Sequence, residues 1–482
     1  MVIALENNPL KDKKHIHFIG IGGSGMYPLA QILNSQGYYL TGSDNNETET
    51  LDAVRKMGIP VFMGQRAENI EGADLIVYSA AIMADNPELI AAKNSGARIM
   101  ERRELLGLVT SWYSSAICIS GTHGKTTATA MLTQIFVDAN VDISCVIGGK
   151  LPAIGGSGRA GKSDIMVCEA CEFVDTFLKL YPDVSVILNV DADHLEYFKT
   201  LENIKKSFVK FADNASKAII YNGDDKNTVE VVNKAKDKEK ISFGFGEEND
   251  YCAKIISKCG LRTDFEVCFK GKKECEISIF VPGDHNVLNA LAAVACARYE
   301  GLPYDKIKEG LKSFKGALRR FQRIDEVGGI TIVDDYAHHP AELSVTLKTA
   351  KALDFKRIWA VFQPLTYSRT KILLSDFKDA LSIADIPVIT DIMGSREKNT
   401  IGIYSRDLAK IIPGSVFFDC DNKIQDEQSD KRKTENFAEI CDYIVENALP
   451  GDLVITCGCG DIYKLAKMLA KKLKERYNDK NA

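Results

Sequence analysis

Short apolar stretches alternate with longer amphipathic stretches along most of this chain. The short stretches are typical of buried strands, whereas the amphipathic ones have the spacing of helices. Regular alternation of the two predicts βαβ units and parallel sheets. The pattern restarts twice, so we predict an α/β fold of three domains, at residues 1–110, 111–322 and 323–482.

The hydrophobic pattern also places the individual elements. The predicted strands are residues 15–20, 38–43, 75–78 and 97–100 in the first domain, 115–120, 165–168 and 185–190 in the second, and 330–334, 358–362, 387–390, 415–418 and 452–456 in the third. Helices are expected up to about Ser35, from Lys125 onward, and over 285–299 and 304–314. Residues 215–280 carry several short β patterns, which we assign as extra strands of the second domain. The third domain has the pattern of a doubly wound sheet.

Composition narrows the class of protein. The chain has 482 residues, a net charge of −5 and 45% hydrophobic residues, which is ordinary for a globular protein. No clustered basic excess indicates a nucleic-acid partner. No apolar run is long enough to span a membrane, and the N-terminal residues lack the apolar core of a secretory signal. The thirteen cysteines are scattered, as expected for reduced thiols in a cytoplasmic protein.

A glycine-rich loop follows the strand at residues 115–120 and opens a helix. It reads Gly121-Thr122-His123-Gly124-Lys125-Thr126-Thr127. Glycines allow the backbone N–H groups to turn toward phosphate oxygens, Lys125 is placed to reach the β- and γ-phosphates, and the Thr126 hydroxyl suits Mg²⁺. A plain glycine-rich turn with a surface lysine is the alternative. The strand–loop–helix context favours an ATP-binding phosphate loop.

Two further polar residues follow the neighbouring strands of the same predicted sheet. Glu169 lies just past the end of one predicted strand, and His194 lies just past the end of the next. Because the carboxyl ends of parallel strands meet at one edge, both should approach the phosphate loop. A carboxylate and an imidazole there suit a second Mg²⁺ near the γ-phosphate. A structural role for Glu169 is the alternative.

The first strand of the chain is followed by Gly20-x-Gly22-x-x-Gly25, and the next strand ends at Asp44. This pattern is a dinucleotide fingerprint, although by itself it indicates only a diphosphate at a helix N-terminus. Ser24 adds a hydroxyl to the same loop.

A second set of candidates lies farther along the chain. Asn286 and Asn289 are one turn apart on one helix face and could bind a purine, whereas Asp284 is expected to cap that helix. Beyond the first strand of the third domain, polar residues crowd the carboxyl edge in Asp334-Asp335-Tyr336-Ala337-His338-His339. Four arginines could bind carboxylates or phosphates there: Arg319, Arg320, Arg369 and Arg396.

Together these motifs resemble the Mur ligase family over essentially the whole chain. The resemblance rests on GIGGSGM (20–26), SGTHGKTT (120–127), EACEFVDTFL (169–178), LNVDADHLEYF (188–198), GDHNVLNALAA (283–293), RRFQ (319–322) and DDYAHHPAE (334–342). It implies an N-terminal Rossmann-like domain for a UDP-sugar, a central P-loop ATPase-type parallel sheet with extra β structure for ATP, and a C-terminal Rossmann-like domain for an amino acid.

The resemblance also implies a reaction and its ligands. ATP with Mg²⁺ would phosphorylate the lactyl carboxylate of UDP-N-acetylmuramate, and the amine of L-alanine would attack the acyl phosphate, as in peptidoglycan precursor synthesis. The protein would be a monomer or a weak homodimer with small-molecule substrates and neither a nucleic-acid nor a membrane partner.

Residue roles follow from the same resemblance. Lys125, Glu169, His194 and Arg320 would be catalytic, and Thr126, Glu169 and His194 would bind the metal. ATP would contact Gly121, Thr122, His123, Gly124, Lys125, Thr126, Thr127, Asn286 and Asn289. The UDP-sugar would contact Gly22, Gly23, Ser24, Gly25, Asp44, Ser79 and Glu101, with Arg102 beside them. The amino acid would contact Tyr336, His338 and Arg369.

One position departs from the family. Leu365 stands where many alanine-adding relatives have His, which removes a donor near the expected reaction centre. Three alternatives stay open: a ligase that adds a peptide to the same UDP-sugar, a nucleotide-sugar binding protein without catalysis, and a NAD-dependent dehydrogenase. A dehydrogenase, however, would have no use for the phosphate loop.

Overall fold

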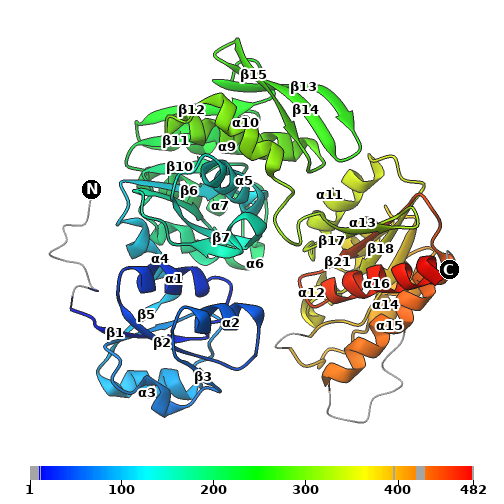
Figure 1. Ribbon diagram of the computed structural model, residues 1–482, viewed down its shortest axis with the longest axis horizontal. Helices are drawn as coiled ribbons and strands as arrows, with labels where there is room; N and C mark the ends of the chain where they lie inside the picture. The colour runs from blue at the N-terminus through cyan, green and yellow to red at the C-terminus, as the bar shows by residue number, and fades with distance from the viewer. Residues whose placement is uncertain (1–9, 11, 395–396, 419–428, 480–482) are drawn as a thin grey trace. The chain divides into compact units, whose positions relative to one another are not determined.

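The computed structural model describes residues 10, 12–394, 397–418 and 429–479. The chain divides into two compact units, Met1–Ala317 and Leu318–Ala482, called here the N-terminal and C-terminal units. The N-terminal unit contains two sheets and the C-terminal unit one, so three α/β sheets are present as predicted (Figure 1). The domain boundaries at 110/111 and 322/323 stay predictions.

The first sheet is parallel throughout and has the strand order β3-β2-β1-β4-β5. Its strands are β1 (His15–Ile19), β2 (Tyr39–Asp44), β3 (Val61–Met63), β4 (Leu75–Tyr78) and β5 (Arg98–Glu101). The helices beside it are α1 (Tyr27–Ser35), α2 (Glu49–Lys56), η2 (Ala67–Ile70), α3 (Pro87–Ser95) and α4 (Arg102–Thr110). The order reverses direction at β1, which places the glycine loop after β1 at a topological switch point, where ligands bind in such sheets.

The second sheet has the order β15-β14-β13-β12-β11-β10-β6-β9-β7-β8. Its strands are β6 (Ser115–Ser120), β7 (Ser144–Leu151), β8 (Gly156–Arg159), β9 (Ile165–Glu169), β10 (Val184–Ile187), β11 (Ala218–Asn222), β12 (Glu239–Gly244), β13 (Tyr251–Cys259), β14 (Arg262–Phe269) and β15 (Lys272–Ile279). The central pairs are parallel. The extra strands predicted for residues 215–280 are present, and the structure shows that β13–β15 among them pair in antiparallel fashion.

Helices cover this sheet and connect its strands. They are α5 (Lys125–Asp138), η3 (Pro152–Ile154), η4 (Phe173–Lys179), α6 (Leu195–Phe198), α7 (Leu201–Asn214), α8 (Lys226–Lys234), α9 (Asp284–Tyr299) and α10 (Tyr304–Ser313). Strand β6 is buried along its whole length, as an apolar strand in the middle of a parallel sheet should be. The carboxyl ends of β6 and its neighbours β9 and β10 therefore lie at one edge.

The third sheet has the order β16-β17-β21-β18-β19-β20, and only β16 is antiparallel. Its strands are β16 (Gln322–Val327), β17 (Ile330–Asp335), β18 (Arg357–Phe362), β19 (Ile386–Ile389), β20 (Val416–Phe417) and β21 (Asp452–Cys457). Its helices are α11 (Pro340–Lys351), α12 (Tyr367–Ile372), α13 (Leu374–Leu381), α14 (Ser405–Ile411), α15 (Ser429–Asn447) and α16 (Tyr463–Asp479). Figure 1 shows α15 and α16 side by side.

Residues of β18 alternate between two hydrophobic clusters. Ile358, Ala360 and Phe362 pack into one cluster, whereas Trp359 and Val361 pack into the other. Side chains of a strand point to opposite faces in turn, so this sheet is buried on both sides. The doubly wound pattern predicted for residues 323–482 is therefore present.

The predicted strands agree with the observed ones to within three residues at either end. The prediction that Asp284 caps its helix is wrong. Gly283 is the N-cap residue and provides no side chain, whereas Asp284 is the first residue of α9 and pairs with Lys258 at 2.5 Å.

Among the described residues, no helix combines the length and the apolar composition of a membrane span.

Candidate functional site

The glycine loop joins the end of β6 to the start of α5. Gly124 is the N-cap residue of α5 and has φ +85°, in the left-handed region that favours glycine. A Cβ atom at Gly124 would also lie 2.5 Å from Oδ1 of Asn289. Glycine is therefore required here both by the backbone and by the closeness of α9. The free N–H groups at the start of α5 form a site suited to phosphate.

A neighbouring loop holds the phosphate loop in place. Asn189 accepts a hydrogen bond from the His123 N–H at 2.8 Å and donates one to the His123 carbonyl at 3.0 Å. The Thr122 hydroxyl accepts from the Asp191 N–H at 2.8 Å. The polar segment that follows β10 thus supports the backbone of the phosphate loop, and the exposed His123 ring lies 3.7 Å from Asp191.

Lys125 is folded back over its own loop. Its ammonium donates to the carbonyls of Gly121 at 2.6 Å and Thr122 at 3.0 Å, and pairs with Glu172 at 2.9 Å. Burial lowers the pKa of Lys125, but the Glu172 carboxylate outweighs this effect and the pKa is raised overall. Lys125 is therefore charged, and its three donors already have acceptors.

Thr126 and Glu169 meet beside this lysine. The Thr126 hydroxyl donates to Oε1 of Glu169 at 3.1 Å, and the Gly148 N–H donates to Oε2 at 2.7 Å. A Cβ atom at Gly148 would lie 2.6 Å from Oε2 of Glu169, so the carboxylate rests directly on this glycine.

The chemistry of these donors fits a magnesium ion. A hydroxyl and a carboxylate provide hard oxygen ligands, and Mg²⁺ in nucleotide sites usually takes one or two protein ligands together with phosphate oxygens and water. Within the described residues no group of three or more His, Cys, Asp and Glu side chains forms a complete metal cage. The site therefore suits an ion that arrives with a nucleotide.

His194 lies beyond β10 and is the N-cap residue of α6. Its ring packs against Phe173 with centroids 4.7 Å apart, and its Nε2 lies 3.9 Å from Asp193. Phe173 begins η4, the segment that follows Glu172. The predicted ligands thus come from the ends of adjacent strands, as expected.

The predicted purine contacts are buried near the phosphate loop. Asn286 donates to the Pro282 carbonyl at 2.7 Å and accepts from Asn289 at 3.0 Å. The side-chain oxygen of Asn289 also lies close against Gly124 of the loop. The pair therefore ties α9 to the loop.

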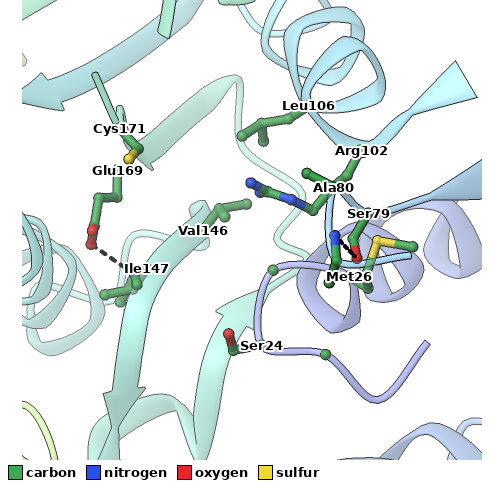
Figure 2. A pocket seen from close by; sticks show the side chains of 14 residues that line it. Ser24, Met26, Ser79, Ala80, Arg102, Leu106, Val146, Ile147, Glu169 and Cys171 are labelled. Atoms are coloured by element: carbon green, nitrogen blue, oxygen red, sulfur yellow. Dashed lines mark hydrogen bonds between the residues drawn. The ribbon is translucent and has the colours of Figure 1, made fainter. Parts of the chain in front are cut away.

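A cavity of about 420 Å³ lies between the first and second sheets of the N-terminal unit (Figure 2). One wall comes from the glycine loop after β1 and from the start of α4, and the other from β7 and the end of β9. The lining residues are Gly23, Ser24, Gly25, Met26, Ser79, Ala80, Ala81, Arg102, Leu106, Val146, Ile147, Gly148, Glu169 and Cys171. Figure 2 shows the Arg102 guanidinium pointing into the cavity, with Glu169 on the opposite wall.

Some residues predicted to contact the UDP-sugar make contacts within the protein instead. Asp44 accepts a hydrogen bond from the Gly22 N–H at 3.0 Å and so shapes the loop. Glu101 pairs with Arg103 at 2.8 Å and caps α4. Arg102, in contrast, is the charged residue that lines the cavity.

The two arginines before β16 differ in role. The Arg319 guanidinium donates to Asp334 at 3.0 Å and to the carbonyl of Gly460 at 3.0 Å, so it fixes the loop after β21. Arg320 lies over the Tyr336 ring, 5.3 Å from its centroid. Its charge helps to lower the pKa of Glu342 and of His338. Arg320 therefore faces the polar residues at the end of β17, residues 334–339, which are called here the polar edge.

The remaining predicted residues of the C-terminal unit gather around that edge. The His338 ring packs edge-on against the Tyr336 ring, with centroids 5.5 Å apart. Arg369 lies on α12, and its buried Nη1 has no hydrogen-bond partner among the described residues. An unpaired guanidinium nitrogen suits a carboxylate ligand. Leu365 forms a bridge to Met393 at the start of the same loop, and Arg396 lies outside the described residues.

Three residues at these sites were not singled out from the sequence: Glu172, Gly148 and Glu342. Glu172 follows Glu169 by three positions, and Glu342 follows His338 by one helical turn. Both spacings are visible in the sequence, but each residue alone resembles an ordinary surface acid. Nothing in the sequence marks Gly148.

Comparison with known families gives three adjoining matches. Residues 15–113 match the Mur ligase family, catalytic domain; residues 119–297 match the Mur ligase middle domain; and residues 319–460 match the Mur ligase, glutamate ligase domain. The three matches together cover most of the chain.

Individual proteins are similar over nearly their whole length. The UDP-N-acetylmuramate–L-alanine ligase of Caldanaerobacter subterraneus subsp. tengcongensis is 42% identical over 97% of this chain and 99% of its own. The crystal structure of the UDP-N-acetylmuramate–alanine ligase of Thermotoga maritima has a TM-score of 0.79 at 26% identity and covers 96% of this chain and 100% of its own. A murein peptide ligase of Psychrobacter arcticus has a TM-score of 0.68 at 24% identity, covers 95% and 98%, and shares the fold.

Proposed function

This chain belongs to the Mur ligase family, and we propose that it joins L-alanine to the lactyl carboxylate of UDP-N-acetylmuramate with ATP as the energy source. The product would be a precursor of peptidoglycan. The similarity to alanine-adding relatives at 42% identity supports this acceptor.

One observation carries the proposal. The cavity of the N-terminal unit has the glycine loop of the first sheet on one side and Glu169 on the other. Glu169 also contacts Thr126 of the phosphate loop. A ligand whose diphosphate lies on the first loop can therefore extend its carboxylate toward the γ-phosphate of ATP.

For the first step, we assign the phosphate loop and Asn286 and Asn289 to ATP. Magnesium bound by Thr126, Glu169 and His194 would offset the charge of the transferred phosphoryl group. Lys125 would exchange an acceptor on the protein for a phosphate oxygen, since its three donors are otherwise used. Arg320 would bind the same phosphoryl group.

For the sugar nucleotide, we assign the residues of the cavity and the loop that borders it. Gly23, Ser24 and Gly25 would bind the diphosphate through backbone N–H groups, and Arg102 would add a positive charge. Ser79 lines the same cavity, whereas Gly22, Asp44 and Glu101 would act by shaping the loops.

For the second step, we assign the polar edge of the C-terminal unit to alanine. The buried, unpaired Nη1 of Arg369 suits the alanine carboxylate. Tyr336 and His338 would line the site beside it. The amine would then attack the acyl phosphate, and the tetrahedral intermediate would collapse to the amide and phosphate.

The direct test measures phosphate release from ATP with UDP-N-acetylmuramate, with and without L-alanine. Release that requires both, and that falls by at least about 10²-fold in Lys125→Ala, is the expected result. A tripeptide in place of alanine tests the peptide-adding alternative.

The other outcomes have distinct meanings. Release that needs the tripeptide and ignores alanine would replace the acceptor. ATP binding without any release of phosphate, with all substrates present, would favour a nucleotide-sugar binding protein without catalysis.

A further inference from the structure

The imidazole of His338 has two acceptors at one of its nitrogens. Nδ1 lies 3.1 Å from the Tyr336 carbonyl and 3.2 Å from Oε2 of Glu342. The same Glu342 oxygen accepts the backbone N–H groups of His338 at 3.0 Å and His339 at 3.2 Å. The carboxylate is thereby fixed at the start of α11, where it closes a capping box.

These contacts select one tautomer. A carbonyl and a carboxylate can only accept hydrogen bonds, so Nδ1 must carry a hydrogen in both charge states of the ring. In the neutral ring the lone pair is therefore on Nε2. A partner at one ring nitrogen commonly determines which atom of a histidine reacts.

On this basis, and resting on the function proposed above, we propose that His338 accepts a proton from the ammonium group of the incoming amino acid at Nε2. Glu342 is the positioning residue that orients the ring. Alanine arrives mainly as an ammonium ion at neutral pH, and only the neutral amine has a lone pair with which to attack.

The charges around His338 suit a base. Burial lowers the pKa of His338; Glu342 and the Tyr336 carbonyl raise it, Arg369 and Arg320 lower it, and the net shift is downward. The ring is therefore neutral near pH 7 before substrate binds. A substrate carboxylate paired with Arg369 would offset one of the two positive charges and so raise the proton affinity of Nε2.

Protons and electrons balance over the bonds that form and break. One N–H proton moves from the ammonium to Nε2, and the freed lone pair forms the C–N bond to the carbonyl carbon of the acyl phosphate. The C–O bond to phosphate then breaks, and phosphate leaves with the bonding pair. The second N–H proton leaves with the departing phosphate, which gives a neutral amide.

Two nucleophiles separate this role from a structural one. Hydroxylamine is uncharged at neutral pH and needs no base before it attacks an acyl phosphate. In His338→Asn the amide nitrogen can still donate to the Tyr336 carbonyl, but the proton acceptor is lost. Alanine-dependent phosphate release should fall by about 10²–10⁴-fold, whereas hydroxylamine-dependent release should be retained.

The positioning role has a separate readout. In Glu342→Gln an amide oxygen can still cap α11, but the negative charge near Nδ1 is gone. The acid limb of kcat/KM for alanine should move to lower pH by about one unit, because the imidazolium is less stabilised. Asp376→Asn removes an exposed carboxylate from the first turn of α13 and should leave the profile unchanged.

Equal loss of the alanine and hydroxylamine reactions in His338→Asn would overturn the base, and an unmoved acid limb in Glu342→Gln would overturn the positioning role. Wild-type enzyme that responds to hydroxylamine but not to alanine would instead refute the proposed acceptor, and this inference with it.

Discussion

At the scale of single residues, the position of the Glu169 carboxylate depends on its close contact with Gly148. A Gly148→Ala methyl group would overlap the Glu169 carboxylate, the flexible end of that side chain, which can move aside. Folding should therefore change by less than about 1 kcal/mol. Turnover should fall by about 10–100-fold, because a displaced carboxylate no longer meets Thr126.

Steady-state kinetics with titrated Mg²⁺ and thermal unfolding measure the two effects. Lys150→Ala, on the same strand and with a half-exposed side chain, is the matched control. Unchanged turnover in Gly148→Ala would show that Glu169 does not need its present position.

The Lys125–Glu172 pair makes a second prediction at this scale. Both side chains are mostly buried, and the carboxylate is the only anion paired with Lys125 among the described residues. In Glu172→Gln the nucleotide-free protein should lose about 1–3 kcal/mol, because a buried ammonium keeps only neutral acceptors. Added MgATP should recover part of this loss, since phosphate supplies a new anion.

Chemical unfolding with and without MgATP measures both quantities. Glu309→Gln removes an exposed partner of Lys306 on α10 and should have little effect in either condition. Equal stabilisation by MgATP in wild type and Glu172→Gln would contradict the exchange of partners.

At the scale of elements, a buried carboxylate joins two central strands of the C-terminal unit. Asp452 begins β21 and accepts from Arg357 of β18 at 2.6 Å, from the Trp359 indole at 3.0 Å and from the Leu449 N–H at 2.9 Å. Burial raises the pKa of Asp452, but the hydrogen bond from Arg357 and the other donors outweigh it, so the pKa is lowered.

A lowered carboxyl pKa stabilises the fold above the unfolded-state pKa, about 3.9, and this contribution disappears as pH falls through the lower folded value. Asp452→Asn should therefore cost about 2–4 kcal/mol at pH 7 and less near pH 3. Denaturant unfolding at both pH values tests this. A difference that stays constant with pH would show that charge is not the cause, and Glu326→Gln, an exposed pair with Arg323, is the control.

At the scale of the whole molecule, every ATP contact assigned here except Arg320 belongs to the N-terminal unit. MgATP should therefore raise the unfolding transition of that unit, by about 2.7 kcal/mol at a hundred times its Kd. Calorimetry of wild type and Lys125→Ala measures this difference. Equal stabilisation of the two proteins would indicate that nucleotide binds elsewhere.

The local pattern of the sequence was enough to predict three α/β sheets. Strand β6 is apolar at its four central residues, Ala116–Ile119, and β18 places its residues in two clusters, so both carry the signature of buried parallel strands. Asp284 shows where such reasoning fails. A residue type favoured at helix caps instead took part in an ion pair with Lys258, which lies on a strand distant in sequence.

The sequence by itself determined the phosphate loop and the sheet edge at which Glu169 and His194 arrive, because strand periodicity and glycine placement are local properties. The tertiary structure decided which neighbours act together. Glu172 pairs with Lys125, and Arg102 rather than Glu101 lines the cavity. Arg319 is hydrogen-bonded to Asp334, whereas Arg320 faces the polar edge. Each of these choices depends on distances between elements far apart in the chain, which no local pattern encodes.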